Sequence, residues 1–297
     1  MASPVGHASA EAAELTKVRA LRQVPPSVRV RRALRRMSAS IANVWLIAIV
    51  PLLWEAVART SPTRYFPPLS EVMAEFKVMW LSSDWQRLFL SDLFYGTVVP
   101  SMSRLARGWG LAVVVGIVCG FIIGRSRLTA RMFHPVIRFW MATPKVVLLP
   151  IAVQIFGIAD SMNIFLIFFG TVWLILINTA DGVAGVDAAW LRSARSMQLS
   201  RPTLYRRVLL PAASPQIFTG LRVSIGIGLI LVIVSELYAT TEGLGYQIAI
   251  FQSTFEYVRM WSAFLLIALI GILLNMAFTA LERRAVRWQR RTGLGGL

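Results

Sequence analysis

The sequence is poor in the residue types that build disulfides, metal sites and catalytic dyads. Cys119 is the only cysteine among 297 residues and lies in an apolar stretch, which excludes a disulfide framework and a thiolate metal cluster. His7 and His134 are the only histidines, and neither has a second ligand at metal-binding spacing. The sequence also has no Gly-Lys pair, so it lacks the G-x-x-x-x-G-K-[ST] loop that binds nucleotide phosphates. We therefore expect no metal, no cofactor and no ATP hydrolysis by this chain.

Acidic residues are scarce too, since 14 Asp and Glu stand against 31 Lys and Arg, for a formal net charge of +17. On a soluble protein this charge would suggest nucleic-acid binding. Here the basic residues gather at the ends of apolar stretches and form no patch interleaved with aromatic residues. We therefore expect no nucleic-acid partner and interpret the charges as determinants of membrane topology.

Long apolar stretches dominate the chain. Hydrophobic residues make up 56% of it, and the mean hydropathy is +0.63, both high for a soluble domain. Six stretches of roughly 15 to 25 residues match the length of helix that crosses a lipid bilayer. The sequence predicts an all-α membrane protein with six transmembrane helices, at Ile41–Val57, Trp109–Ile123, Phe133–Phe156, Ile164–Ala180, Ile217–Leu237 and Trp261–Leu281.

Orientation follows from the basic residues, because Lys and Arg gather in the loops that stay in the cytosol. Most of the 31 basic residues lie in segments that share one side of the six-span topology, namely 1–40, 125–131, 181–216 and 282–297. Both termini are therefore expected in the cytosol. We divide the chain into a basic N-terminal tail (1–40), a six-helix transmembrane domain (41–281) and a basic C-terminal tail (282–297).

Small residues recur at every fourth position in two of the predicted spans. They are Gly116, Gly120 and Gly124 in the second span and Gly220, Ser224 and Gly228 in the fifth. This spacing places small side chains along one ridge of a helix, where a neighbouring helix can approach closely. We interpret both ridges as helix-packing surfaces.

The longest internal cytosolic segment, 181–216, has a pattern of its own. It contains VDAAWLRSARSMQLSRPTLYRRVLLPAASP, in which apolar residues recur at helical spacing between arginines. Proline is typical of the first turn of a helix and of the residues that follow one. We expect two short amphipathic helices, the second beginning near Pro202 and ending near Pro211.

This segment resembles the cytosolic loop of ABC importer permeases, whose pattern is Glu-Ala-Ala, three residues, Gly, nine residues, then Ile-x-Leu-Pro. The pattern falls on Arg192, Ser193, Ala194, Gln198, Val208, Leu210 and Pro211. Arg192 reverses the charge of the usual Glu. Gln198 replaces the Gly that most easily takes a positive φ. Either the turn has another geometry, or Gln198 is strained.

Other segments resemble the sulfonate, taurine and nitrate importer permeases in the same chain order. These segments are FPPLSEV, GTVVPSMSRLARGWGLAVVVGIVCGFIIG, ATPKVVLLPIAVQIFGIAD and SELYATTEGLGYQI. The resemblance implies the type I importer permease fold and a non-catalytic permease subunit in the bacterial cytoplasmic membrane. It further implies a small, anionic organic or inorganic solute as the transported substrate.

The resemblance also implies partners. They are a second permease copy in a homodimer, two ATP-binding subunits that hold ATP and Mg, and an extracytoplasmic substrate-binding protein. In this family the cytosolic loop acts as a coupling helix seated in a groove of the ATPase. The residues expected to couple are Arg192, Ser193, Ala194, Gln198, Leu199, Ser200, Tyr205, Val208, Leu210 and Pro211, within a coupling loop at 187–211.

Charged residues near or within the spans are candidates for the transport pathway, because charge inside a membrane is costly. Glu236 is the strongest, followed by Lys145 and Arg222. Arg222 could instead snorkel or pair, as could Glu55. Lys145, next to Pro144, could favour an anionic solute, pair with a carboxylate or snorkel. We expect Arg104 and Arg107 at the outer interface, about one turn before the second span.

Two other classes of membrane protein compete with the importer hypothesis. An intramembrane serine hydrolase would need a Ser nucleophile and a His base, for which only His134 is eligible. A secondary transporter would be expected to show inverted repeats, and none is evident in this sequence.

Overall fold

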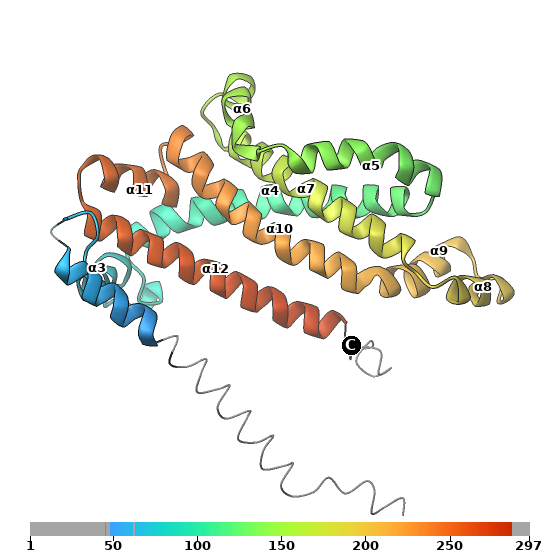
Figure 1. The fold of residues 1–297 in the computed structure, drawn as a ribbon, viewed down its shortest axis with the longest axis horizontal. Helices are drawn as coiled ribbons and strands as arrows, with labels where there is room; N and C mark the ends of the chain where they lie inside the picture. The colour runs from blue at the N-terminus through green and yellow to red at the C-terminus, as the bar shows by residue number, and fades with distance from the viewer. Residues whose placement is uncertain (1–44, 46–47, 62, 287–297) are drawn as a thin grey trace, which may run out of the picture. The chain divides into compact units, whose positions relative to one another are not determined.

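The structure of the chain is a computed structural model that describes residue 45 and residues 48–61 and 63–286 (Figure 1). The chain divides into two units, Met1–Thr63 and Arg64–Leu297. In the first unit residues 48–60 are helical, and Arg59 pairs with Glu55 at 2.7 Å. The described part of the first predicted span is therefore helical, and the pairing considered for Glu55 is confirmed. The N-terminal tail and most of the C-terminal tail lie outside the described residues.

The second unit consists of helices, and within the described residues the only β pairing is an isolated bridge between Leu81 and Leu90. Its α-helices in chain order are α3 (Leu69–Trp80), α4 (Asp92–Gly124), α5 (Arg127–Ala142), α6 (Leu149–Phe156), α7 (Asp160–Ala184), α8 (Ala188–Ser196), α9 (Arg201–Leu204), α10 (Leu210–Ala239), α11 (Leu244–Ser253) and α12 (Tyr257–Ala285). Short 3₁₀-helices lie at Trp85–Arg87 and Lys145–Leu148, and a π-helix at Tyr205–Leu209 joins α9 to α10.

Among the described residues, four helices are long and apolar enough to cross a membrane: α4, α7, the continuous helix Arg201–Ala239, and α12. A fifth crossing results if α5 and Lys145–Phe156 form one bent span. Each predicted span after the first thus has a helical counterpart, which agrees with the expected all-α membrane fold.

Helix α4 begins at Asp92, well before the predicted start of the second span at Trp109. Ser91 caps it by accepting a hydrogen bond from the Phe94 N–H at 3.1 Å. The added first half of α4 escaped the prediction because its polar side chains contact other helices, so its hydropathy is low although several of its residues are buried. Arg104 lies inside this helix and is 3% exposed, so it is buried within the protein, and its expected place at the outer interface stays a prediction.

The third predicted span is sharply bent. Its two helical segments, Leu128–Ala142 and Lys145–Phe156, meet at 88° across Thr143 and Pro144. The Lys145 ammonium donates to the backbone carbonyls of Trp140 and Thr143, the latter at 2.7 Å. Lys145 therefore caps the carboxyl end of α5, whose last carbonyls have no partner in the helix and carry partial negative charge.

Helix α7 packs most extensively on α4 and α10 (Figure 1). A Cβ atom added at Gly120 would lie 2.5 Å from the Cβ of Thr179, and one added at Gly220 would lie 2.6 Å from the Cβ of Asn178. The small residues therefore allow α4 and α10 to approach α7 more closely than any larger side chain would permit. The packing role predicted for the two ridges is confirmed.

The second helix of segment 181–216 does not end at Pro211, as the sequence had predicted. The chain is helical without interruption from Arg201 to Ala239, a length of 39 residues. A proline in a helix lacks an N–H donor and crowds the carbonyl four residues earlier, here that of Arg207. The π-helix at Tyr205–Leu209 surrounds that carbonyl and widens the turn, which lets the helix pass through the proline. The predicted start is confirmed, since Pro202 lies in the first turn of α9.

Candidate functional site

Helix α8 and the turn after it form the first half of the predicted coupling loop. Asp187 caps α8 by accepting a hydrogen bond from the Ala189 N–H at 2.8 Å. At the other end, the Gln198 N–H donates to the Arg195 carbonyl at 2.9 Å, and the Leu199 N–H donates to the Ala194 carbonyl at 3.2 Å. This pair of bonds is the Schellman motif, in which the residue at the position of Gln198 is left-handed and usually Gly.

Gln198 has φ of +50°, so it occupies that left-handed position without being glycine. The turn therefore keeps the geometry that a Gly would give, and Gln198 carries the backbone strain, on the order of 1 to 2 kcal/mol for a residue with a Cβ. Of the two alternatives left open by the sequence, the strained residue is the one observed.

A hollow of about 370 Å³ separates α8 from the π-helix. Five of the expected coupling residues line it: Ser193, Ala194, Leu199, Val208 and Pro211. The others lie around it. Arg192, Gln198, Ser200 and Leu210 are exposed, and the Ser200 and Thr203 hydroxyls are hydrogen-bonded at 2.8 Å. The structure therefore gathers nine of the ten predicted coupling residues in or around one hollow, and Tyr205 is the exception.

Sequence reasoning missed three residues of this hollow. Trp190, Met197 and Arg207 also line it, and Met197 is 73% exposed, the most of any large apolar side chain in α8 and its turn. The signal was available, because Met197 falls on the apolar helical spacing of α8. Tyr205 lies elsewhere, half-buried, with the Arg125 guanidinium 5.7 Å from its ring centre.

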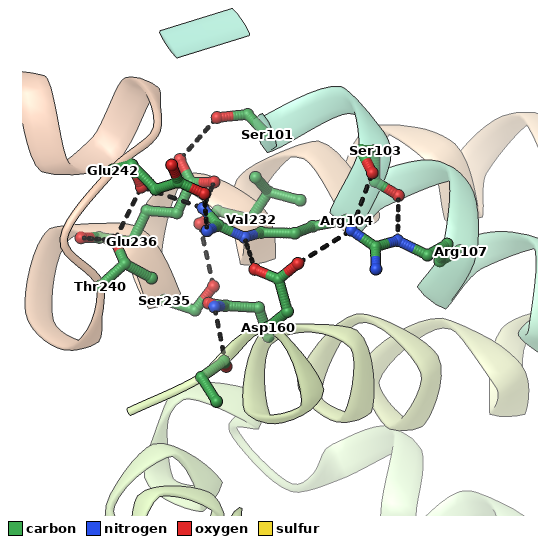
Figure 2. Close-up of polar contacts among 12 residues, drawn as sticks. Ser101, Ser103, Arg104, Arg107, Asp160, Val232, Ser235, Glu236, Thr240 and Glu242 are labelled. Carbon is green, nitrogen blue, oxygen red and sulfur yellow. Dashed lines mark hydrogen bonds and ion pairs between the residues drawn. The ribbon is translucent and has the colours of Figure 1, made fainter. Parts of the chain in front are cut away.

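The second candidate site is an ionic cluster where α4, α7, α10 and α11 meet (Figure 2). Arg104 of α4 occupies its centre. Its Nε donates to Asp160 at 2.6 Å and its Nη1 to Glu236 at 2.8 Å. Its Nη1 also donates to the Glu242 carbonyl at 2.9 Å, and its Nη2 to the Glu242 carboxylate at 3.0 Å. One guanidinium thus joins the start of α7, the end of α10 and the loop before α11.

Glu236 is 0% exposed, and both of its carboxylate oxygens accept hydrogen bonds. Oε2 accepts from the Ser101 hydroxyl at 2.7 Å and from the Gly245 N–H at 3.0 Å, in the first turn of α11. Anions are stabilised at helix amino ends. In this conformation the carboxylate is closed off from solvent, so a direct contact with a transported solute stays a prediction.

Gly243 and Gly245 make room for this carboxylate. Gly243 has φ of +113°, and a Cβ added there would lie 2.5 Å from the Glu236 carboxyl carbon. A Cβ at Gly245 would lie 2.6 Å from that of Glu236. Both glycines are therefore required by the close approach of Glu236 to α11, the first also by its backbone conformation.

Arg107 extends the cluster to the surface. It donates to Asp160 at 2.9 Å and to the Ser103 hydroxyl at 2.8 Å, and its side chain is 52% exposed (Figure 2). Its expected place at the outer membrane interface stays a prediction. The roles of Ser101, Asp160 and Glu242 were missed, because their partners are distant in the sequence.

The three pathway candidates lie apart. Glu236 is in the ionic cluster, which we call the outer cluster after its place in the predicted topology, whereas Arg222 lies 14 positions earlier on α10, about 21 Å along a helix. Arg222 pairs with Glu282 of α12, which confirms the pairing considered from the sequence. Lys145 is half-buried at the bend, and a Cβ added at Gly170 would lie 3.6 Å from its Cγ. The carboxylate partner considered for Lys145 is replaced by backbone carbonyls.

Solved structures with the same arrangement of helices exist. An inward-facing form of the MetNI methionine ABC transporter superposes with a TM-score of 0.56 at 19% identity, over 66% of this chain and 99% of that one. A chain of an amino acid ABC transporter crystallised with histidines superposes with a TM-score of 0.51 at 20% identity, over 66% and 93%. These likenesses show the type I ABC importer permease fold.

Sequence comparisons point the same way. The chain is 29% identical over 260 residues to the taurine transport system permease protein TauC of Escherichia coli, covering 86% of this chain and 90% of TauC. It is 30% identical to the bicarbonate transport system permease protein CmpB of Synechococcus elongatus, over 80% and 86% of the two chains. The model of the inner membrane components of binding-protein-dependent transport systems matches residues 112–291. The chain therefore belongs to this family of transport-system membrane components.

Proposed function

We propose that this chain forms half of the translocation pathway of an ATP-driven importer for a small anionic solute. The proposal is supported by its relatives, whose names specify taurine, bicarbonate and, for NrtB of Leptolyngbya laminosa at 32% identity, nitrate. All three are small solutes that carry a negatively charged, oxygen-bearing group. The substrate-binding protein that delivers the solute would select among such anions.

As an ABC importer permease, the chain is a non-catalytic, multi-pass inner membrane protein, and ATP hydrolysis belongs to separate subunits. We propose that it acts as a homodimer with two ATP-binding subunits that hold ATP and Mg and with one extracytoplasmic binding protein. The coupling loop, 187–211, would dock on the ATP-binding subunit.

The observation that carries this proposal is the continuous helix Arg201–Ala239. Its first residues belong to the coupling loop, and near its last turn Glu236 belongs to the outer ionic cluster. A helix of 39 residues spans about 58 Å and transmits displacement along its axis. A movement imposed at the coupling loop would therefore reach the outer cluster through one continuous helix, which includes the π-helix at Tyr205–Leu209.

The position of Lys145 supports the proposal that the transported solute is an anion. Its side chain lies against Gly170 of α7, well inside the apolar part of that helix, at a bend of 88°. Broken helices near the middle of a membrane form the solute sites of many transporters. We propose that the Lys145 charge, although hydrogen-bonded to carbonyls of α5, adds to the potential that attracts the anion.

We propose that both termini face the cytosol, as the distribution of arginine indicates. With Cys119 replaced by Ser, single cysteines introduced at Asp84 and Thr241 should react with a membrane-impermeant maleimide in intact cells. A cysteine at Ser200 should react only after the cells are opened. The reverse pattern would place the coupling loop outside and overturn the topology.

Transport itself is tested by reconstitution. The chain, its ATP-binding subunit and its binding protein should take up labelled taurine, nitrate or bicarbonate into proteoliposomes only when ATP is present inside a vesicle that exposes the binding-protein face. Uptake driven by an ion gradient without ATP would indicate a secondary transporter instead. A serine hydrolase is disfavoured, because the Nδ1 of His134 accepts a hydrogen bond from Arg138 at 3.0 Å. The neutral ring then carries its proton on Nε2, and that nitrogen cannot take a proton from a serine.

A further inference from the structure

A hollow of about 490 Å³ lies beside the turn between α4 and α5. Its floor is apolar and includes Ile117, Phe121 and Ile122 from the last turns of α4. Its rim is polar, since Arg125 and Tyr205 line it together with two hydroxyl side chains. The turn and the coupling loop lie at the same end of the second unit (Figure 1). This hollow is therefore apolar toward the membrane interior and basic toward the surface.

A second hollow, of about 460 Å³, lies between α4, α5 and α7 and has a mostly apolar lining. Ile122 and Thr129 line both hollows. The two spaces are therefore neighbours, separated by these two side chains, near the turn between α4 and α5. Cys119 and Trp173 line the second hollow only.

Arg125 supplies charge at the rim of the first hollow. Its guanidinium lies 5.7 Å from the centre of the Tyr205 ring, a cation–π contact that fixes its position. In the described part of the chain no carboxylate forms an ion pair with Arg125, and the side chain is exposed. Its charge is thus available to an external anion.

We propose that one anionic phospholipid binds here, with its phosphate against Arg125 and its two acyl chains in the two hollows. Basic groups above apolar spaces between membrane helices recognise anionic lipid headgroups. Two neighbouring, mostly apolar spaces with one basic group at the rim of the first match a molecule with two chains and one charged head. Under the proposed topology the lipid belongs to the inner leaflet. It would contact Tyr205, the first residue of the π-helix that joins the coupling loop to α10.

Native mass spectrometry of the assembled transporter tests this proposal. The complex, in mild detergent, is mixed with phosphatidylglycerol or with phosphatidylethanolamine, and retained lipid is counted per permease chain. We expect phosphatidylglycerol to be retained preferentially and Arg125→Gln to lower its affinity about fivefold, the effect of one basic residue near an anionic headgroup. The matched control Arg131→Gln, an exposed arginine on α5 that lines neither hollow, should retain lipid as the parent does.

A second variant tests the apolar part without changing charge. Val118→Trp should fill the first hollow, which Val118 lines, and lower lipid retention while leaving the assembly intact. Equal retention of both lipids, or equal losses in Arg125→Gln and Arg131→Gln, would overturn the site. The site would also be overturned if a second permease copy sealed the hollows. That outcome would be detected as protection of Cys119 from an apolar maleimide in the dimer prepared without lipid. Normal ATP-dependent uptake alongside any of these results would leave the proposed transport function standing.

Discussion

The outer ionic cluster and the coupling loop both use arginine, but in opposite ways. In the outer cluster Arg104 is 3% exposed, and all three of its guanidinium nitrogens donate to carboxylate or carbonyl oxygens. In the coupling loop Arg192 and Arg195 are exposed, and within the described residues neither has an ion-pair partner.

This difference separates a region that is complete by itself from one that is not. A buried charge must be paired inside the chain, because an unpaired one costs several kcal/mol. Exposed arginines beside an apolar hollow leave both charge and apolar area available to a partner, and rims of this kind set the orientation of docking. The outer cluster is therefore expected to determine stability, and the coupling loop to determine function.

The largest effect is expected from breaking the outer cluster at its centre. Arg104→Met would leave the buried Glu236 carboxylate without its cation, which typically costs about 3 to 5 kcal/mol. The permease should express poorly, and its free energy of unfolding in detergent, measured by denaturant titration, should fall by that amount.

Two further variants make this test specific. Arg107→Met, which removes a half-exposed partner of Asp160, should cost less than about 1 kcal/mol. The double variant Arg104→Met, Glu236→Gln should recover part of the loss, since it removes the unpaired charge. Equal losses for Arg104→Met and Arg107→Met would mean that burial does not distinguish the two arginines.

The next effect concerns the coupling loop. Leu199→Asp places a charge in the half-buried wall of the hollow between α8 and the π-helix. In a packed subunit interface such a change costs about 2 to 4 kcal/mol of binding. We expect the purified complex to lose its ATP-binding subunit, or its substrate-stimulated ATP turnover, while membrane insertion continues. Tyr205→Lys should act similarly, because it removes the ring that Arg125 contacts and places a like charge beside that guanidinium. Normal transport in both variants at normal expression would show that the loop does not dock.

Gly243→Ala tests the outer cluster without changing its charges. With φ of +113° and ψ of 172°, Gly243 lies in a region essentially restricted to glycine, where another residue costs about 1 to 3 kcal/mol. The added methyl group would also press on the Glu236 carboxylate. The free energy of unfolding should fall by about 2 kcal/mol, with Gly226→Ala as the control, since a Cβ there meets nothing within 4 Å. Equal stability in the two variants would remove the requirement for glycine.

The sequence predicted the spans well where one face of a helix meets lipid or another apolar helix. It failed at the first half of α4, because Ser101 and Arg104 are polar residues whose hydrogen-bond partner, Glu236, is more than 100 positions away in the sequence. It failed again at Pro211, because a π-helix that accommodates proline has no simple sequence signature. Hydropathy reports the average polarity of a segment and carries no information on which residues its polar side chains bind in the folded protein.

The candidate sites show the same division. The coupling loop was predicted from a local pattern, and its turn follows from local backbone bonds between Ala194 and Leu199. Lys145 was recognised as unusual, but its partners were missed, since they are backbone carbonyls, which every residue has. Glu236 was recognised as costly inside a membrane, and only the fold reveals that Ser101, Arg104 and Gly245 satisfy it.

The smallest expected effect is a gain in stability, and it separates strain from function within the coupling loop. Gln198→Gly would remove the Cβ from a left-handed residue, which should stabilise the turn by about 1 kcal/mol, less the entropy that Gly loses on folding. The Schellman bonds of α8 would remain, so the loop should keep its shape and the importer should keep its ATP-dependent uptake. Protection of the backbone amides at positions 198 and 199 in hydrogen exchange should rise, whereas protection of the amides in the outer cluster should not change.

Gln198→Ala serves as the matched control, because it shortens the side chain and retains the strained Cβ. If Gln198→Gly lowered transport as much as Leu199→Asp does, the glutamine side chain itself would be a contact with the ATP-binding subunit, and this chain's departure from the family pattern would belong to a matched change in its partner.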